Sequence, residues 1–458
     1  MVQVPSGRAR GQKKAFLLYR ARTVRGWTGP EFARRLMKLA THRGVPLGTG
    51  KDGVYRWESG RTPEPEAQRL IAELLGIDLD ALGTSPWPHW LALDPLQQPP
   101  RRSWDAHGAI AALNDVSKDH PMPMDRRNFV LLTGVALTSS LWEWLTADPA
   151  AAGQITHGGR LGEAAVARLE QRVRSLRHDD DVDGGGELIR EADSSLKLVA
   201  NLLEQRTYSD AHGARLHAAA ADLARMKAWA TFDLHGACDD ATFDAALHTA
   251  HAAADPALGC HILAFWAIAA YNTDRAADAE KMINAALSAA RGRATPRIEA
   301  MLYSRRARAR AHQRDPRCWN DLDRAATLLE RGATQDDPDW VSWFDRSELL
   351  GALASSQLDM DQPSRAEGTF VEASELFPAD RVRTQSLFLA RRADAQWRQG
   401  EIEGSCVTAN AALALNETIS SHRSTGPLHE LASRMESHMA VPAVRDFRER
   451  LNASLAAG

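Results

Sequence analysis

The hexapeptide SRRARA at residues 304–309 is followed by the similar ARRADA at residues 390–395, 86 positions further along the chain. Pairs of small residues mark the chain at shorter steps of 40, 40, 47 and 39 residues. The second residues of these pairs are Ala246, Ala286, Ala326, Ala373 and Ala412. A period near 40 residues is long enough for two helices and their turns, so it predicts an α-solenoid.

Residues that favour turns lie between these pairs, near Gly236, Asn272, Asp315, Asp361 and Gly400. Alanine is abundant and runs of β-branched residues are scarce, which favours helices over strands. Two further helices are expected at residues 155–178 and 186–206, separated by the acidic turn HDDDVDGGG. We therefore expect an all-α protein in which residues 155–458 form a tetratricopeptide-like helical repeat domain.

The first part of the chain differs from the rest in charge and in helix length. Residues 1–76 contain 15 Lys and Arg against 6 Asp and Glu, whereas the whole chain has a net charge of -3. Short amphipathic blocks end at glycines, namely Gly26, Gly60 and Gly76. Thr28 is suited to cap the second helix, with Pro30 in its first turn. Four short helices predict a helix-turn-helix domain at residues 1–82, and its basic charge favours an anionic partner.

Three stretches of this domain resemble the Xre/Cro-type helix-turn-helix regulators: WTGPEFARRL at 27–36, VYRWESGRTP at 54–63 and LIAELLG at 70–76. They are similar in particular to a large actinobacterial group that also carries a tetratricopeptide-like C-terminal domain. PWPHWL at residues 86–91 is similar to the tail of the domain in that group, whereas the loop from residue 42 to residue 50 is longer than in the short form of the family. The resemblance implies a DNA-binding transcriptional regulator, and it extends to peptide-pheromone regulators, which join the same two parts.

The predicted recognition helix begins near Lys51. Such a helix lies in the major groove with its N-terminal side chains against base edges. Lys51 can reach guanine acceptors and Asp52 can accept from cytosine, while Tyr55 and Arg56 lie one turn further along. The remaining predicted DNA contacts are to phosphates, from Arg61, Lys13, Lys14 and Arg35.

The opposite face of this helix is expected to be structural. Val54 and Trp57 are three positions apart, so they share a face and should pack inward. The resemblance also implies that Glu58 fixes a neighbouring arginine or backbone group. The preceding VPLGTGKD at residues 45–52 is similar to a phosphate-binding loop, but a valine replaces its first glycine and an aspartate replaces its Mg²⁺-binding hydroxyl residue. We expect a turn between two helices there.

Residues 83–154 are expected to connect the two domains. Five prolines between residues 86 and 100 prevent a continuous helix, and Trp87, Trp90 and Trp104 should fix this segment to one of the domains. Residues 124–145 resemble a twin-arginine export signal, but they lie far from the N-terminus. We expect a buried helix there that joins the domains, with Asp125 as its N-cap.

The concave groove of a helical solenoid suits a peptide or another protein. Two pairs of arginines occupy equivalent repeat positions, and guanidinium groups that face the groove would bind carboxylates. Tryptophans of the repeats, including Trp229 and Trp266, would add apolar pockets. The tentative ligand-binding residues are Arg305, Arg306, Arg391, Arg392, Trp343 and Trp397. In the competing interpretation, the arginines form ion pairs between repeats and the tryptophans are core residues.

The sequence has no nucleophile elbow, HExxH motif or metal-binding cluster, and its four cysteines are isolated from one another. We expect no enzyme activity, no cofactor, no metal site and no membrane association. The favoured function is a cytoplasmic transcriptional regulator that binds a double-stranded operator as a homodimer, under the control of a peptide or small-molecule effector in the repeat domain. The alternative is a scaffold or adaptor that uses the repeat domain to bind another protein.

Overall fold

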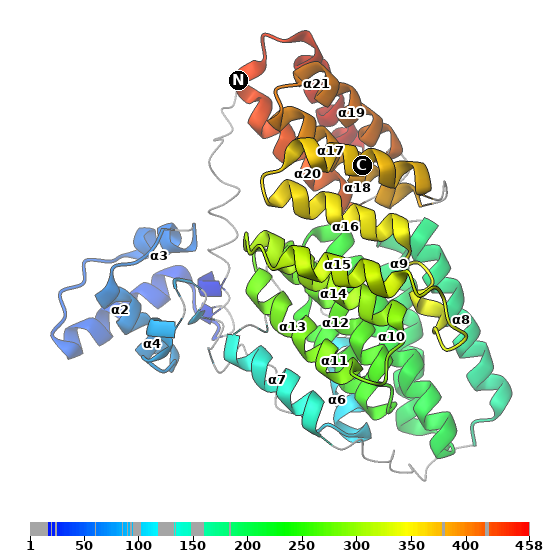
Figure 1. Ribbon diagram of the computed structural model, residues 1–458. Coiled ribbons are helices and arrows are strands. Elements are labelled where there is room, and N and C mark those ends of the chain that lie inside the picture. Colours follow the sequence, from blue (N-terminus) through cyan, green and yellow to red (C-terminus); the bar gives the residue numbers. More distant parts are fainter. Residues whose placement is uncertain are drawn as a thin grey trace. The chain divides into compact units, whose positions relative to one another are not determined.

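The computed structural model describes residues 17–19, 21–22, 25–59, 61–84, 86–88, 90–91, 94, 102–117, 132, 134–147, 160–182, 185–377, 381–416 and 421–457. These residues form an all-α fold of paired helices, which confirms the predicted fold class (Figure 1). The only β-bridge in the described part joins Arg160 to Thr207. None of its helices is long and apolar enough to span a membrane.

The chain divides into two compact units. The head unit contains residues 1–101 and 120–140, and the repeat unit contains residues 102–119 and 141–458. These boundaries differ from the predicted division at residues 82 and 154, because the segment expected to be a separate connector is shared between the two units.

The head unit has short helices at the expected places. Its helices are α2 (Gly29–Arg43), α3 (Lys51–Glu58), α4 (Pro65–Leu75) and α5 (Ala81–Thr84), and residues 17–19 and 21–22 are also helical. Thr28 caps α2 by accepting a hydrogen bond from the backbone N–H of Glu31. Gly44 and Gly76 end α2 and α4 in the left-handed conformation, with φ of 67° and 74°.

The tail of the head unit packs into the core of that unit. Trp87, Trp90 and Leu91 are buried in the same apolar cluster as the residues of α2, α3 and α4. Arg25 donates to both carboxylate oxygens of the fully buried Asp94, at 2.6 and 2.8 Å, and to the last carbonyl of α4. Two of the three connector tryptophans therefore belong to the head. The third, Trp104, lies in the repeat unit, where its ring stacks on His248 at 3.7 Å.

The repeat unit begins with α6 (Ala106–Ser117). The helices that follow are α8 (Glu163–Val182), α9 (Gly185–Gln205), α10 (Asp210–His235), α11 (Asp240–Ala252), α12 (Pro256–Tyr271), α13 (Ala276–Ala290), α14 (Pro296–His312), α15 (Cys318–Leu329), η2 (Asp339–Val341), α16 (Arg346–Asp359), α17 (Pro363–Leu376), α18 (Val382–Arg398), α19 (Ile402–Leu415), α20 (His422–Arg434), η4 (Met435–His438) and α21 (Pro442–Ala457). The acidic stretch expected to be a turn continues α8 to Val182, so the break between α8 and α9 is shorter than predicted.

A further helix, α7 (Gly134–Thr146), occupies the segment that resembles an export signal. The boundary between the two units falls within it, after Ser140. Leu137, Leu141 and Trp144 are buried, whereas Trp142 is exposed. The predicted N-cap, Asp125, lies outside the described residues.

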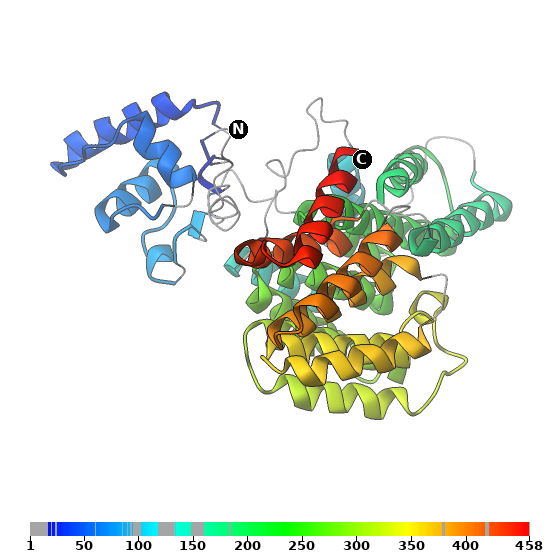
Figure 2. The ribbon, with the colours of Figure 1, turned by 90° about the horizontal axis from the view of Figure 1, so that it is seen from above.

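Consecutive helices of the repeat unit pair as helical hairpins. The first pair is α10 with α11 and the last is α18 with α19, and a tight turn joins the two helices of each pair. One residue of each turn has a positive φ, and these residues are Gly236, Asp274, Arg314, Asp361 and Gly400. They lie at or within two residues of the predicted turn positions, which confirms the register of the repeat. The order of colours from green through yellow to red follows this succession of pairs (Figures 1 and 2).

The alanines that revealed the period lie in the second helix of each pair. Ala246, Ala286, Ala373 and Ala412 are fully buried, and in α15 the fully buried alanine is Ala325. A methyl group at these positions allows the two helices of a pair, and the next pair, to approach closely.

The succession of pairs turns far enough for its ends to meet. Helix α10 contacts α20, and α8 contacts α18, although these helices are far apart in the sequence. The first helices of the pairs therefore enclose a common interior, where the pocket described below lies.

The turn at Gly400 provides a test of the repeat register. Its φ of +84° is strained for any residue with a Cβ, so Gly400→Ala is expected to lower the free energy of unfolding by about 1 kcal/mol. Gly368→Ala is the matched control, because Gly368 is exposed inside α17 with open space around it. Alanine there should raise stability by about 0.5–1 kcal/mol. Thermal unfolding of the two variants should shift in opposite directions, and shifts of the same sign would contradict this description of the turn.

Candidate functional site

One face of α3 in the head unit carries the predicted base-contacting residues. Lys51, Asp52 and Arg56 are exposed, and Tyr55 is 43% exposed. Val54 lies fully buried on the opposite side with Trp57, as their spacing predicts. The core thus fixes which side of α3 faces outward.

The first turn of α2 supports this exposed face. A Cβ at Gly29 would lie 2.7 Å from the Tyr55 ring, so the ring packs directly on the backbone of α2. Arg56 donates from Nε to the backbone carbonyl of Asp52 at 3.2 Å, which holds its side chain along the helix towards the N-terminus. Gly50 precedes α3 and provides no side-chain cap, so the first N–H groups of α3 receive no side-chain acceptor from that position.

A buried ion pair holds the other end of α3. Arg22 donates to the two carboxylate oxygens of Glu58 at 2.5 and 3.2 Å and to the carbonyl of Trp27 at 3.0 Å. Both side chains are almost completely buried. Glu58 therefore fixes an arginine, one of the two kinds of partner that the resemblance implies, and the pair joins the first helical segment of the head to α3.

The predicted phosphate-contacting residues have different surroundings. Arg61 is exposed just beyond α3. Arg35 on α2 pairs with Glu31 at 2.9 Å and lies over the Trp27 ring at 4.6 Å, while its side chain stays half exposed. Lys13 and Lys14 lie outside the described residues.

The repeat unit contains a pocket with a volume of about 330 Å³. It is lined by α8, by the first helix of each pair from α10 to α20, and by the segment around η2; α11, α13, α15, α17 and α19 contribute none of its lining residues. Seven arginines and two acidic residues line it, together with four aromatic rings. The arginines are Arg174, Arg177, Arg225, Arg305, Arg381, Arg383 and Arg423. The interior of the solenoid is therefore strongly cationic.

Two buried aspartates of α10 accept hydrogen bonds from four of these arginines. Asp222 accepts from Arg225 at 2.7 Å and also pairs with Arg177 on α8. Burial by itself would raise the pKa of Asp222, but the two guanidinium groups outweigh it and hold this pKa below its usual range. Asp233 accepts from Arg383 at 3.2 Å and from Arg423 at 3.3 Å.

Other polar groups at the pocket have no partner in the described part of the chain. These are the Nε of Arg305, the Nη1 of Arg225 and both ring nitrogens of His261. Arg305 is 8%, Arg225 3% and His261 2% exposed. Burial and then the charge of Arg225 lower the pKa of His261 well below its ordinary value, so the imidazole is neutral.

The aromatic rings of the pocket lie against its cationic groups. Arg305 is above the Trp343 ring at 5.3 Å, and Arg225 is above Phe265 at 4.6 Å. The Trp340 ring lies 4.2 Å from the ring of His261. Such stacking covers the flat faces of the two guanidinium groups and holds them in a fixed orientation.

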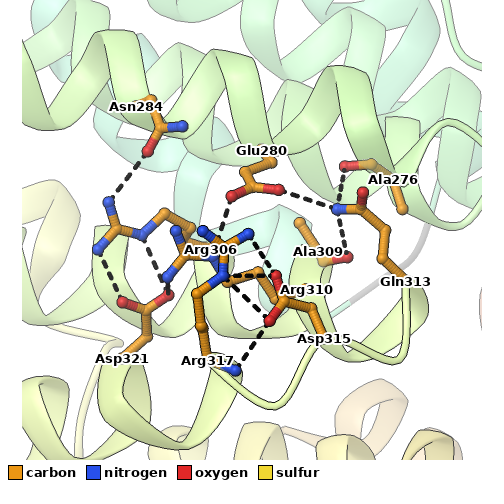
Figure 3. A network of polar contacts seen from close by, with 10 residues as sticks. All are labelled: Ala276, Glu280, Asn284, Arg306, Ala309, Arg310, Gln313, Asp315, Arg317 and Asp321. Atoms are coloured by element: carbon orange, nitrogen blue, oxygen red, sulfur yellow. Dashed lines mark hydrogen bonds and ion pairs between the residues drawn. The ribbon is translucent and has the colours of Figure 1, made fainter.

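Two of the six tentative ligand residues, Arg305 and Trp343, line this pocket, and the other four lie elsewhere. Arg306 does not line the pocket and takes part instead in a polar network with residues of α13 and α15 (Figure 3). It donates to both oxygens of Asp321 on α15, at 3.0 and 2.7 Å, and to Asn284 on α13. Arg306 therefore joins neighbouring repeats, as the competing interpretation of these arginines predicts.

The remaining three residues also make structural contacts. Arg391 donates to Ser355, and burial together with the nearby charge of Arg308 lowers its pKa to about 10. Arg392 lies 3.7 Å from Glu367. Trp397 packs on the C-terminal apolar cluster and on the ring of His438. Arg305 and Arg391 occupy equivalent positions in the repeated motif, but only Arg305 lines the pocket.

The sequence interpretation missed most of the pocket residues. A weak signal was present in the first helices, where a basic residue precedes an aromatic residue by four positions: Arg225 and Trp229, then His261 and Phe265. That spacing places both side chains on one helix face. The residues from α8, α18 and α20 give no such signal, because the turning of the solenoid brings them to the pocket.

Residues 18–84 match the sequence profile of a family described as the SP15 N-terminal domain. No curated protein matches the chain. The match covers α2, α3 and α4 of the head and does not reach the repeat unit.

The ion pair between Arg22 and Glu58 gives a prediction for the head. Glu58→Ala should destabilise the head by about 3 kcal/mol, because it leaves a buried guanidinium without its carboxylate. Glu31→Ala is the control, since it removes the exposed partner of Arg35 and should cost less than about 0.5 kcal/mol. Hydrogen exchange of the α3 amides in the full chain measures both. Equal protection in the two variants would show that Glu58 does not hold α3.

The contacts of Asp233 give a prediction for the repeat unit. Asp233→Ala removes the carboxylate shared by two largely buried arginines from α18 and α20, and it should lower the stability of the repeat unit by about 3 kcal/mol. Glu372→Ala breaks the exposed pair with Arg346 and should cost less than about 1 kcal/mol. Thermal unfolding and hydrogen exchange in α20 are the measurements. Unchanged exchange in α20 of the Asp233→Ala variant would contradict this role.

Proposed function

We propose that this protein is a DNA-binding transcriptional regulator of the Xre/Cro type, in which the head unit binds a double-stranded operator through α3. The observation that carries this proposal is the exposed face of α3, where Lys51, Tyr55 and Arg56 project from a helix whose other face is fixed in the core. Side chains that reach base edges must be both exposed and held in a fixed direction.

The charge of the head agrees with this function. Residues 1–76 carry nine more basic than acidic residues, which favours association with the phosphate backbone. Arg61, beyond the end of α3, and Arg35 on α2 are exposed and suited to phosphate contacts. Such domains bind operators in pairs, with one recognition helix in each half-site. We therefore propose a homodimer that acts in the cytoplasm, where its DNA lies.

The repeat unit is proposed to bind the effector. Its cationic pocket supports this role, because buried donors without partners suit a ligand better than they suit a scaffold. A ligand changes operator affinity only if it prefers one arrangement of the two heads. The usual coupling is about 1–3 kcal/mol, or roughly 5–150-fold in affinity.

The operator contacts can be tested by substitution in the full chain. Lys51→Ala and Arg56→Ala should each weaken binding to a selected operator by about 1–3 kcal/mol and have a smaller effect on random DNA. Lys13→Ala should weaken binding to both DNAs alike and lower the salt slope by about one. Arg346→Ala, an exposed arginine of the repeat unit, is the control and should change nothing.

Genome-wide footprinting with the purified protein would supply the operator. If the protein bound DNA without a dependence on salt, or did not bind it, the adaptor function would replace this proposal. If all three head variants lost affinity equally on operator and random DNA, the assignment of base contacts to α3 would be wrong.

A further inference from the structure

The pocket of the repeat unit contains three buried polar side chains whose hydrogen-bonding capacity is only partly used in the described part of the chain. Arg225 comes from α10, His261 from α12 and Arg305 from α14, and all three line the cavity. Each is more than nine-tenths buried, and each has a nitrogen without a partner in the described part of the chain. A buried donor without an acceptor is unfavourable in the folded protein. Their convergence on one cavity therefore points to an acceptor that is supplied from outside the chain.

The charge of the pocket indicates what kind of acceptor this is. Asp222 and Asp233 already accept from four of the arginines, and Asp345 lies 3.5 Å from Arg381. Among the lining residues only Asp339 and Glu348 are acidic. Burial raises the pKa of Glu348, although the nearby charges of Arg305 and Arg381 act in the opposite direction. A ligand with more than one negative charge would balance the remaining guanidinium groups.

The number of separate donors distinguishes between anions. A carboxylate offers two oxygens in a plane, and a single arginine fork satisfies both. The donors here belong to three separate helices, α10, α12 and α14, so a single arginine fork does not supply them. A phosphate monoester offers three terminal oxygens in a tetrahedral arrangement and a charge between -1.5 and -2 near neutral pH.

The rest of the cavity is suited to an apolar group. Trp229, Trp340 and Ile268 line it beside the cationic groups. Its volume of about 330 Å³ is at the lower end of the range for small-molecule sites, about 300–1,000 Å³.

We propose that the interior of the repeat unit binds a small phosphate monoester with an aromatic or apolar body, the phosphate being held by Arg225, His261 and Arg305. The rings of Trp343 and Phe265 keep the two guanidinium groups oriented, and neutral His261 donates through one ring nitrogen. The phosphate monoester would be the effector of the regulator. Only its effect on operator affinity rests on the proposed function, and the phosphate site itself does not.

Phenyl phosphate is the probe, with inorganic phosphate, benzoate and phenol as comparisons. Calorimetry and thermal shift on the full chain should give the order phenyl phosphate, inorganic phosphate, benzoate and phenol, with phenyl phosphate at least about tenfold tighter than benzoate. Benzoate equal to or tighter than phenyl phosphate would overturn the assignment of a phosphate, and an absence of binding by all four would overturn the site.

Neighbouring arginines of α14 provide a matched pair of variants. Arg305→Gln removes a buried charge that forms no ion pair with the residues the structure describes, so the variant without ligand should melt at the same or a higher temperature. It should bind phenyl phosphate at least about tenfold more weakly, with Arg305→Lys between the two. Arg306→Gln breaks the fork on Asp321 and should lower the melting temperature without weakening the binding of phenyl phosphate.

A substitution of Glu348, which also lines the pocket, should change the affinity for phenyl phosphate in the opposite direction. Glu348→Gln removes a negative charge from the pocket and should tighten phenyl phosphate several-fold. The proposal fails if Arg305→Gln binds as well as the wild type, or if Arg306→Gln loses binding to the same extent. If phenyl phosphate binds as expected but the wild type does not bind DNA, the proposed function fails and the phosphate site stands.

Discussion

The carboxylate of Asp233 is completely buried near the end of α10, and the residues that neutralise it follow 150 to 190 positions later in the chain. Arg383 and Arg423 donate to it from the starts of α18 and α20, and Ser421 donates from the cap of α20 at 3.0 Å. A buried carboxylate without these donors would be strongly unfavourable. The contact therefore requires the solenoid to turn until its last pairs meet α10, and this turning creates the interior.

The two helices of each pair differ in composition, because only the first helix faces the interior. The second helices carry the buried alanines, and they pair with the first helices in polar networks such as Arg306 of α14 with Asp321 of α15 (Figure 3). The first helices carry the arginines and aromatic residues of the pocket. The contacts between repeats and the pocket thus lie on different sides of the first helices. The free donors at the pocket oppose stability, which is a common property of binding sites.

The head, like the repeat unit, is held together by an ion pair between largely buried side chains. Arg22 and Glu58, both nearly completely buried, hold one end of α3, and the contact of Tyr55 with Gly29 supports its exposed face. Trp87 and Trp90 from the following segment complete the core. The side of α3 that faces outward is consequently fixed before any ligand binds, so a DNA surface on α3 would be preformed.

The sequence by itself determined the features that depend on local periodicity: the all-α class, the repeat near 40 residues, the positive-φ turns at Gly236, Asp361 and Gly400, and the buried face of α3. Each of these depends on residues within one helix or one turn. The pocket was decided only by the tertiary structure. Arg305 and Arg306 are adjacent in a motif that recurs at Arg391 and Arg392, yet only Arg305 reaches the interior. Which arginine does so depends on the rotation of each helix and on the closure of α10 against α20, and these are set by contacts between residues that are more than a hundred positions apart.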